Sequence, residues 1–217
     1  MSDLYQTISQ PSEGEFRDRG SKFIAYAYPV YSLEACQERQ EAVRKLHPKA
    51  RHHCYAYRLQ PDGQLFRAND DGEPSGTAGR PILGQIDSFG LTNVIVIVIR
   101  YFGGTKLGTS GLINAYKTSA MEAFKAAKII EKTVENLYQL HFDYALMSNV
   151  MNAVKKLQMN ILAQDFTDSG RLEVAIRQSE VDDQLLRLKA LVAKVRIEEA
   201  AALKGIPGLK VSYLRTR

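Results

Sequence analysis

A glycine-rich segment is the part of this sequence best suited to bind an anion. It follows an unbroken β-branched run at residues 94–99 and precedes a helix predicted from about Leu112. Glycines let the backbone approach a ligand, and the free N–H groups of a helix N-terminus favour negative charge. The predicted anion-binding residues of the segment are Arg100, Gly103, Gly104, Lys106, Thr109, Ser110 and Gly111.

A second polar loop, residues 69–81, carries the candidate catalytic residues Asp70, Asp71 and Glu73. Such carboxylates can hold Mg²⁺ or act as general bases, although a solvated turn-rich loop is the simpler interpretation. Thr77 and Arg80 add donors in the same loop. Because both glycine loops flank one buried strand, we expect them to form one pocket at an end of the sheet.

Several familiar sites are not supported by the sequence. The frame of a phosphate-binding P-loop and that of a dinucleotide-binding turn are both missing, which argues against ATP hydrolysis and NAD chemistry. His52 and His53 are neighbours in a predicted strand and therefore face opposite ways, so they are poorly placed to share a zinc ion. A phosphate contact or a structural role suits them better. We expect no metal and no cofactor.

Composition and charge limit the class of protein. The chain has 217 residues, a net charge of +5 and a pI near 9.1, which is compatible with an RNA partner and also with many enzymes. Its two cysteines, Cys36 and Cys54, predict reduced thiols rather than a disulfide framework. No apolar run is long enough to span a membrane, and the first residues do not resemble a secretory signal. We therefore expect a cytoplasmic protein without a membrane partner.

The first part of the chain predicts alternating strands and helices. Strands are expected at residues 23–30, 54–59, 65–68 and 94–99, and helices at 33–46 and 112–127, with a short segment of undefined type at 82–89. Ser32 is a suitable N-cap for the first helix. The strand at residues 94–99 does not alternate, which predicts burial on both faces.

The second part predicts a β-α-β-β-α-β order. Strands are expected at residues 137–143, 160–167, 171–178 and 195–198, with helices at 146–157 and after Ser179. Asp168-Ser169-Gly170 is a hairpin turn signature. The end of the chain, from Lys204, has four basic residues and no acidic one, and we expect it to dock on the domain. The predicted domains are 1–135 and 136–217, in an α+β protein.

The two loops together resemble a known family. Residues 70–79 and 100–108 are similar to the signature of the IMPACT/YigZ family, and the resemblance extends to the small C-terminal domain of its bacterial members. It implies an N-terminal domain with the ribosomal protein S5 domain 2-like fold and a ferredoxin-like C-terminal domain. It also implies an association with translational control, which eukaryotic members show.

These observations leave three functional hypotheses. The leading one is a regulatory protein, not an enzyme, that binds RNA, the ribosome or a translation-associated partner through its glycine loops. The first alternative is an enzyme acting on a phosphorylated or peptide-like small molecule, with or without Mg²⁺. The second is a protein-interaction module that uses the small C-terminal sheet. The ligand and the oligomeric state do not follow from the sequence.

Overall fold

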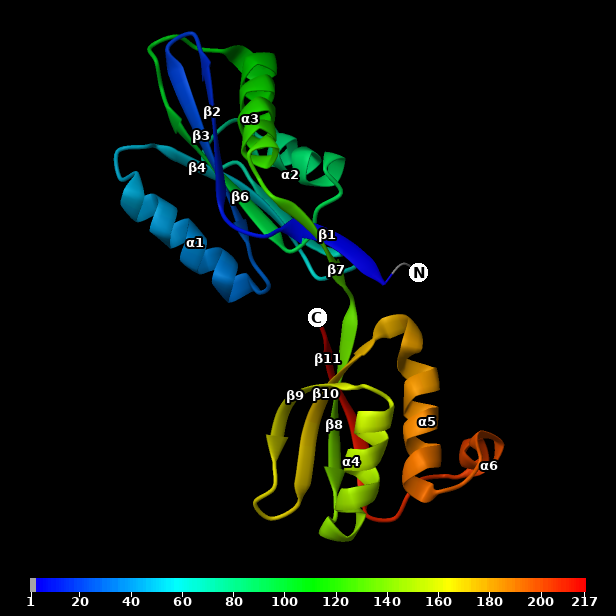
Figure 1. The fold of residues 1–217 in the computed structure, drawn as a ribbon. Coiled ribbons are helices and arrows are strands. Elements are labelled where there is room, and N and C mark those ends of the chain that lie inside the picture. Colours follow the sequence, from blue (N-terminus) through cyan, green and yellow to red (C-terminus); the bar gives the residue numbers. More distant parts are fainter. Residues whose placement is uncertain (1–2) are drawn as a thin grey trace. The chain divides into compact units, whose positions relative to one another are not determined.

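The computed structural model describes residues 3–217 and divides them into two compact units (Figure 1). The N-terminal unit is Leu4–Lys132, and the C-terminal unit is Thr133–Arg217 with Asp3. Both combine helices with antiparallel sheets, so the α+β class is confirmed. Within residues 3–217 no helix is long and apolar enough to cross a membrane.

A five-stranded antiparallel sheet in the order β2-β3-β6-β4-β5 is the centre of the N-terminal unit. Helix α1 covers one face, and α2 and α3 cover the other (Figure 1). The strands of the sheet are β2 (Ser12–Asp18), β3 (Ser21–Pro29), β4 (His52–Leu59), β5 (Leu65–Asn69) and β6 (Val94–Tyr101). The helices are α1 (Leu33–Leu46), α2 (Gly79–Ser88) and α3 (Gly108–Lys125), and a separate two-stranded ribbon pairs β1 (Leu4–Ile8) with β7 (Ile129–Thr133).

Strand β6 is buried on both faces, as its sequence predicts. Val94, Val96 and Val98 pack in the core under α2 and α3, whereas the alternate isoleucines pack in the core under α1. Because side chains alternate along a strand, Arg100 continues the valine side. The strand thereby places a guanidinium under the polar loop instead of another apolar side chain.

Helix α3 begins at Gly108, four residues before the predicted start at Leu112. The predicted start was therefore one turn late, in a segment where Gly108 and Gly111 have low helix propensity. The first turn tolerates them, since the first four N–H groups of a helix have no partner within it. Thr109 and Ser110 therefore belong to the helix, and only residues 102–107 form the loop.

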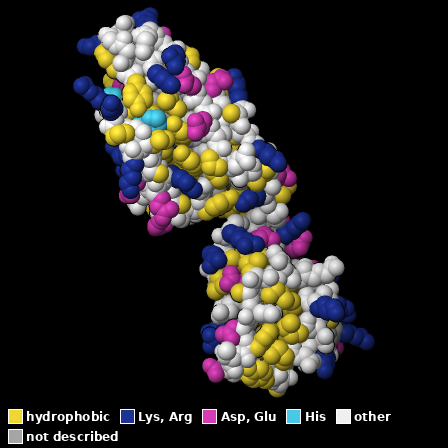
Figure 2. Space-filling view, turned by 60° about the vertical axis from the view of Figure 1, so that its left-hand side comes forward, with side chains coloured by type: hydrophobic (Ala, Val, Ile, Leu, Met, Phe, Trp, Pro, Cys, Tyr) yellow, Lys and Arg dark blue, Asp and Glu magenta, His cyan; other side chains and the backbone are white. Residues whose placement is uncertain are grey.

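The C-terminal unit has the expected β-α-β-β-α-β order with one additional short helix, α6, before the last strand, and it forms a four-stranded antiparallel sheet in the order β11-β8-β10-β9. The hairpin around Asp168-Ser169-Gly170 is confirmed. Figure 2 shows hydrophobic side chains gathered in a stripe on this unit. Its strands are β8 (Glu135–Phe142), β9 (Asn160–Asp165), β10 (Gly170–Arg177) and β11 (Leu209–Thr216). Its helices are α4 (Met147–Lys156), α5 (Val181–Ala193) and α6 (Ile197–Ala202), with short 3₁₀ turns at Tyr144–Leu146 and Gln178–Glu180.

The last strand lies elsewhere than predicted. Residues 195–198 are not a strand: Lys194 ends α5 in the left-handed conformation, with φ of 58°, and α6 begins at Ile197. The Glu199 carboxylate accepts a hydrogen bond from the Arg196 N–H at 3.3 Å, which favours the helix start over a strand. The strand that completes the sheet is β11, in the basic tail, where it pairs with β8. The tail is therefore docked, as expected.

Candidate functional site

A cavity of about 390 Å³ lies at the Arg100 end of the central sheet. In the described part of the chain, its lining contains no Asp or Glu. Phe102 is 58% exposed, so it is not a core aromatic. Figure 2 shows histidines of the N-terminal unit reaching the surface beside hydrophobic and cationic side chains. The residues that line the cavity are Lys49, Arg51, His52, Arg100, Tyr101 and Phe102.

Beneath this cavity, Arg100 is held by a buried ion pair. Its Nη1 donates to the Glu73 carboxylate at 2.7 Å, with 9% of the Arg100 side chain and 4% of the Glu73 side chain exposed. The Tyr116 hydroxyl donates to the same Glu73 oxygen at 2.9 Å. Burial raises the pKa of Tyr116, so its hydroxyl keeps its proton and stays a donor. Arg100 Nε has no hydrogen-bond partner among residues 3–217.

Asp70 holds the polar loop together. Its carboxylate accepts hydrogen bonds from the backbone N–H groups of Gly76, Ala78 and Gly79 at 2.8–3.0 Å. Burial raises the pKa of this carboxyl, but the three N–H bonds outweigh that effect and the pKa is lowered. Because α2 begins at Gly79, Asp70 stabilises the N-terminus of that helix from outside it.

Asp71 connects this loop to strand β4 and helix α1. Its carboxylate accepts from the His53 N–H at 2.6 Å and from Arg44 Nη2 at 3.0 Å. His52 Nδ1 lies 2.9 Å from the Asp71 carbonyl. The three candidate carboxylates, Asp70, Asp71 and Glu73, therefore already have protein partners. No group of three or more His, Cys, Asp or Glu residues suited to a metal ion occurs within residues 3–217.

The other predicted site residues are distributed between the loop, the helix start and the protein interior. Gly103 donates its N–H to Ser21 Oγ at 3.1 Å, so that group is used inside the protein. Thr77 is buried and its hydroxyl donates to the Pro74 carbonyl. Arg80 is exposed on the first turn of α2. The exposed residues of the predicted anion-binding segment are Gly103, Gly104, Lys106, Thr109 and Ser110.

The two buried thiols are unsuited to chemistry. Cys36 and Cys54 are both free and buried. Burial raises the pKa of Cys36 to about 12 and also raises that of Cys54. Cys54 lies within hydrogen-bond distance of the Asp70 carbonyl and the Tyr116 hydroxyl, so it extends the buried network. Since the thiolate is the nucleophile, a raised pKa means low reactivity.

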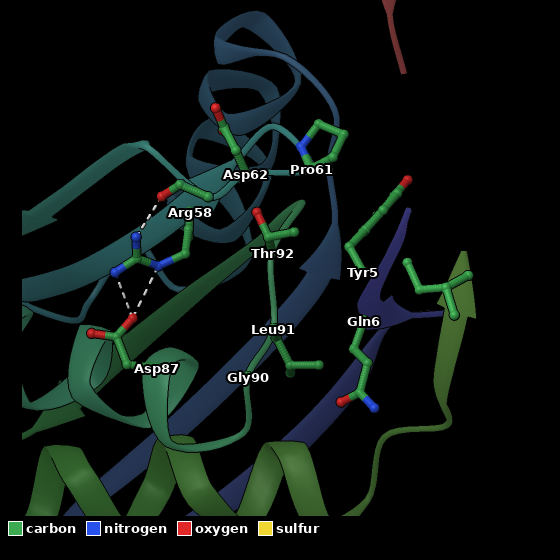
Figure 3. A pocket seen from close by; sticks show the side chains of 11 residues that line it. Tyr5, Gln6, Arg58, Pro61, Asp62, Asp87, Gly90, Leu91 and Thr92 are labelled. Atoms are coloured by element: carbon green, nitrogen blue, oxygen red, sulfur yellow. Dashed lines mark hydrogen bonds and ion pairs between the residues drawn. The ribbon is translucent and has the colours of Figure 1, made fainter. Parts of the chain in front are cut away.

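A second cavity, of about 340 Å³, lies at the opposite end of β6, near Gly90 and Thr92 (Figure 3). The guanidinium of Arg58 in its lining already has protein partners. Arg58 Nε and Nη2 donate to Asp87 Oδ1 at 2.9 and 2.6 Å, and Nη1 donates to the Gly63 carbonyl (Figure 3). An anion would have to compete with Asp87 for this guanidinium. The first cavity is therefore the better anion site.

Several of these residues have little signal in the sequence that would place them at the site. Lys49 and Arg51 precede a strand, where basic residues are usually solvated, and nothing local indicates that the sheet brings them to Arg100. Phe102 follows a core strand, which favours the interpretation of a core residue. Tyr116 lies within a helix, and its bond to Glu73 spans 43 positions. The available signal was the Lys49–Arg51 pair beside His52.

Stability of the N-terminal unit is expected to fall as the pH is lowered from 7.5 to 5.5. Burial lowers the pKa of both His47 and His53. His47 lies between the Tyr26 and Tyr101 hydroxyls, at 2.8 and 2.9 Å. In the unfolded chain the histidine pKa values are near 6.5, so on acidification the unfolded chain binds more protons than the folded one. The free energy of unfolding is therefore highest above about pH 6.5 and falls as the pH is lowered below that value.

Urea unfolding at pH 7.5, 6.5 and 5.5 measures this effect. The variant His47→Gln/His53→Gln should show a smaller loss of midpoint on acidification, whereas His141→Gln, in the C-terminal unit, should behave as the original chain. An equal pH dependence in all three proteins would contradict the assignment.

Comparisons with known proteins agree on one family. The model of the Impact N-terminal domain matches residues 19–124. The chain is 31% identical to IMPACT family member YvyE of Bacillus subtilis, over 84% of each chain. It is 34% identical to IMPACT family member YigZ of Escherichia coli, over 74% of this chain and 80% of that protein.

A solved structure shares the fold of nearly the whole chain. It is described as a hypothetical protein and has a TM-score of 0.72 and 28% identity, with 99% of both chains covered. The structure described as the two-domain translational regulator Yih1 shares 30% identity over 56% of this chain and 47% of that chain. Its TM-score is 0.34, which is too low for a comparison of the folds.

Proposed function

The chain belongs to the IMPACT family, and on that premise we propose that it is a cytoplasmic, translation-linked regulator that binds RNA. Yih1 is described as a translational regulator, and that role is brought to this chain as part of the proposal. We also infer that the two units are the ribosomal protein S5 domain 2-like fold and a ferredoxin-like fold, with domains near 1–135 and 136–217. The β11-β8-β10-β9 order supports the second of these.

The observation that carries the RNA proposal is the cavity at the end of β6. Its charged lining residues are all basic, and an exposed aromatic ring, Phe102, lies beside them. Lys and Arg attract phosphates, and single-stranded RNA is recognised by stacking of bases on aromatic rings. The exposed first turn of α3 follows the same loop and adds N–H groups that favour phosphate. Lys49, Arg51 and Phe102 therefore have the chemistry of an RNA contact.

The geometry favours this proposal over an enzyme. An acid–base or Mg²⁺ role for Asp70, Asp71 and Glu73 would require them to leave their present partners. Asp70 would give up three N–H bonds, and Glu73 would leave Arg100 without its counter-charge. Such changes are costly in a buried site. We therefore assign these carboxylates to holding the loop.

Replacing Lys49 and Arg51 together by alanine is expected to weaken RNA binding and its dependence on salt. The probe is a fluorescein-labelled 20-nucleotide oligouridylate, titrated with the full chain at several salt concentrations between 50 and 200 mM. If each cation contacts one phosphate, the negative slope of log K against log salt should become shallower by about 1.4. Phe102→Ala should weaken binding by about 1–3 kcal/mol with little change of slope.

The control is Lys128→Ala/Lys132→Ala, which removes the same charge from the unit at its opposite end. Lys132 donates to the Tyr31 hydroxyl there. Arg100 is left intact, because its removal would disturb the fold. The proposal would be contradicted if the original chain did not bind the RNA, or if both double variants lost the same amount of RNA affinity.

A further inference from the structure

The C-terminal unit has an apolar groove of about 410 Å³ that the proposed function does not use. It lies between helix α5, strand β11 and the segment that joins α6 to β11. Its apolar residues are Leu185, Leu188, Ile206, Leu209 and Val211. Its remaining residues are Lys189, Lys204, Gly205 and Lys210. The groove therefore combines an apolar floor with basic side chains.

Strand β11 gives this groove an open side. It is at the edge of the sheet, with β8 as its neighbour. An edge strand presents backbone N–H and C=O groups that have no partner strand, and these can pair with another chain. Val211 is 40% exposed and Tyr213 55%, so β11 also keeps accessible apolar side chains along this edge.

The charges near the groove are distributed unevenly. For residues 3–217, lysines are the sole charged residues in the lining. Lys189 Nζ donates to the Leu203 carbonyl, which keeps its ammonium beside the groove. Two acidic residues lie outside the lining: Asp143, whose backbone N–H donates to the Gly208 carbonyl at the start of β11, and Asp182, whose charge raises the pKa of Tyr138, although burial is the larger cause. Tyr138 contacts the ring of Tyr213, so that negative charge lies toward the far end of β11.

We propose that the groove binds an extended acidic peptide segment of a partner protein, which adds a strand to the free edge of β11. Backbone hydrogen bonds to β11 give affinity in this mode, and alternate side chains enter pockets and give specificity. Every second residue of the segment is apolar and packs against Leu185, Leu209 and Val211. Its carboxylates alternate with these apolar residues and therefore face the side of β11 that carries Lys210, the position between Leu209 and Val211. The lysines favour a carboxylate-bearing peptide, and the apolar floor disfavours RNA.

The test uses the full chain and a capped, fluorescein-labelled octapeptide in which Leu and Glu alternate. Binding is followed by fluorescence anisotropy. Val211→Glu and Lys210→Glu are each expected to weaken binding by about tenfold or more, because they place a carboxylate where the proposal needs an apolar or basic group. Both positions are exposed, and circular dichroism confirms that the variants are folded.

Leu162→Glu is the matched control. Leu162 is 37% exposed on β9, the opposite edge of the same sheet, against 40% for Val211 on β11. It should leave peptide binding unchanged. Methylation of alternate amide nitrogens of the peptide should abolish binding, and replacing Glu by Lys in the peptide should do the same.

Three results would overturn the proposal. One is peptide binding that Val211→Glu does not weaken, or that Leu162→Glu weakens as much as Val211→Glu does. Another is an octapeptide whose affinity does not respond to amide methylation. The third is a dimer in light scattering that Val211→Glu converts to a monomer, since the occupant would then be a second copy. None of them bears on RNA binding, because Lys49 and Arg51 belong to the other unit.

Discussion

Replacing Arg100 by methionine is expected to lower the free energy of unfolding of the N-terminal unit by about 3–5 kcal/mol. The substitution keeps most of the side-chain length but leaves the Glu73 carboxylate buried without its counter-charge. With 4% of the Glu73 side chain exposed, water cannot replace the lost partner. Tyr116 supplies one remaining hydrogen bond, which does not neutralise a charge. Urea unfolding of the single variant measures the loss.

The double variant Arg100→Met/Glu73→Leu distinguishes the cost of leaving one buried charge unpaired from the cost of removing the whole ion pair. Removing both charges should recover a large part of the loss, because replacing a buried ion pair by apolar residues is often close to neutral. Arg187→Ala is the surface control. Its partner Asp183 is 61% exposed, and such pairs contribute about 0–1 kcal/mol. Equal losses for Arg100→Met and Arg187→Ala would show that the buried pair has no special role.

Gly103→Ala is the second substitution with a large expected effect. A Cβ atom at this position would lie 1.9 Å from the carbonyl carbon of Gly20 and 2.2 Å from the Ser21 nitrogen. Both are backbone atoms at the turn between β2 and β3, so they cannot move aside as a flexible side chain would. Overpacking of this kind costs about 1–3 kcal/mol, and a contact with rigid backbone should fall in the upper part of that range. Thermal and urea unfolding measure it.

Gly84→Ala is the matched control for that substitution. Gly84 is exposed within α2, and a Cβ atom there meets nothing within 4 Å. The same chemical change should therefore stabilise the protein by about 0.5–1 kcal/mol through helix propensity. Opposite signs at the two positions would show that close packing, and not the added methyl group, decides the result. A neutral Gly103→Ala would contradict the geometry.

Most regular elements could be predicted because their patterns are local. Helix α1 begins and ends where predicted, since Ser32 caps it and Pro48 follows its end. Strands β1, β2 and β7 were missed. Strand β2 reads Ser-Glu-Gly-Glu-Phe-Arg-Asp, which has little hydrophobic alternation, and it is a strand because β3 pairs with it along its length. Tertiary pairing overrides weak local preference in such a segment.

The candidate site was predicted in part. The loop that carries Glu73 does contact Arg100 at the end of β6, but no residue of 69–81 is among those that line the cavity there. Their partnership as a buried ion pair did not follow from the sequence, because a spacing of 27 residues carries no signal of contact. The same is true of Lys49 and Arg51, which reach the cavity through the pairing of His52 with Arg100 across β4 and β6.

The place of β11 in its sheet has a consequence for synthesis. Strand β8 leaves the ribosome early and pairs on one side with β10, but its other side is completed by a strand that ends at residue 216 of 217. At ordinary translation speeds the interval between Phe142 and Leu209 lasts roughly 3–13 s. During that interval β8 has no partner on the side that β11 later occupies. Truncation before Leu209 would make the exposure permanent, so such a product should become a target for chaperones and proteases.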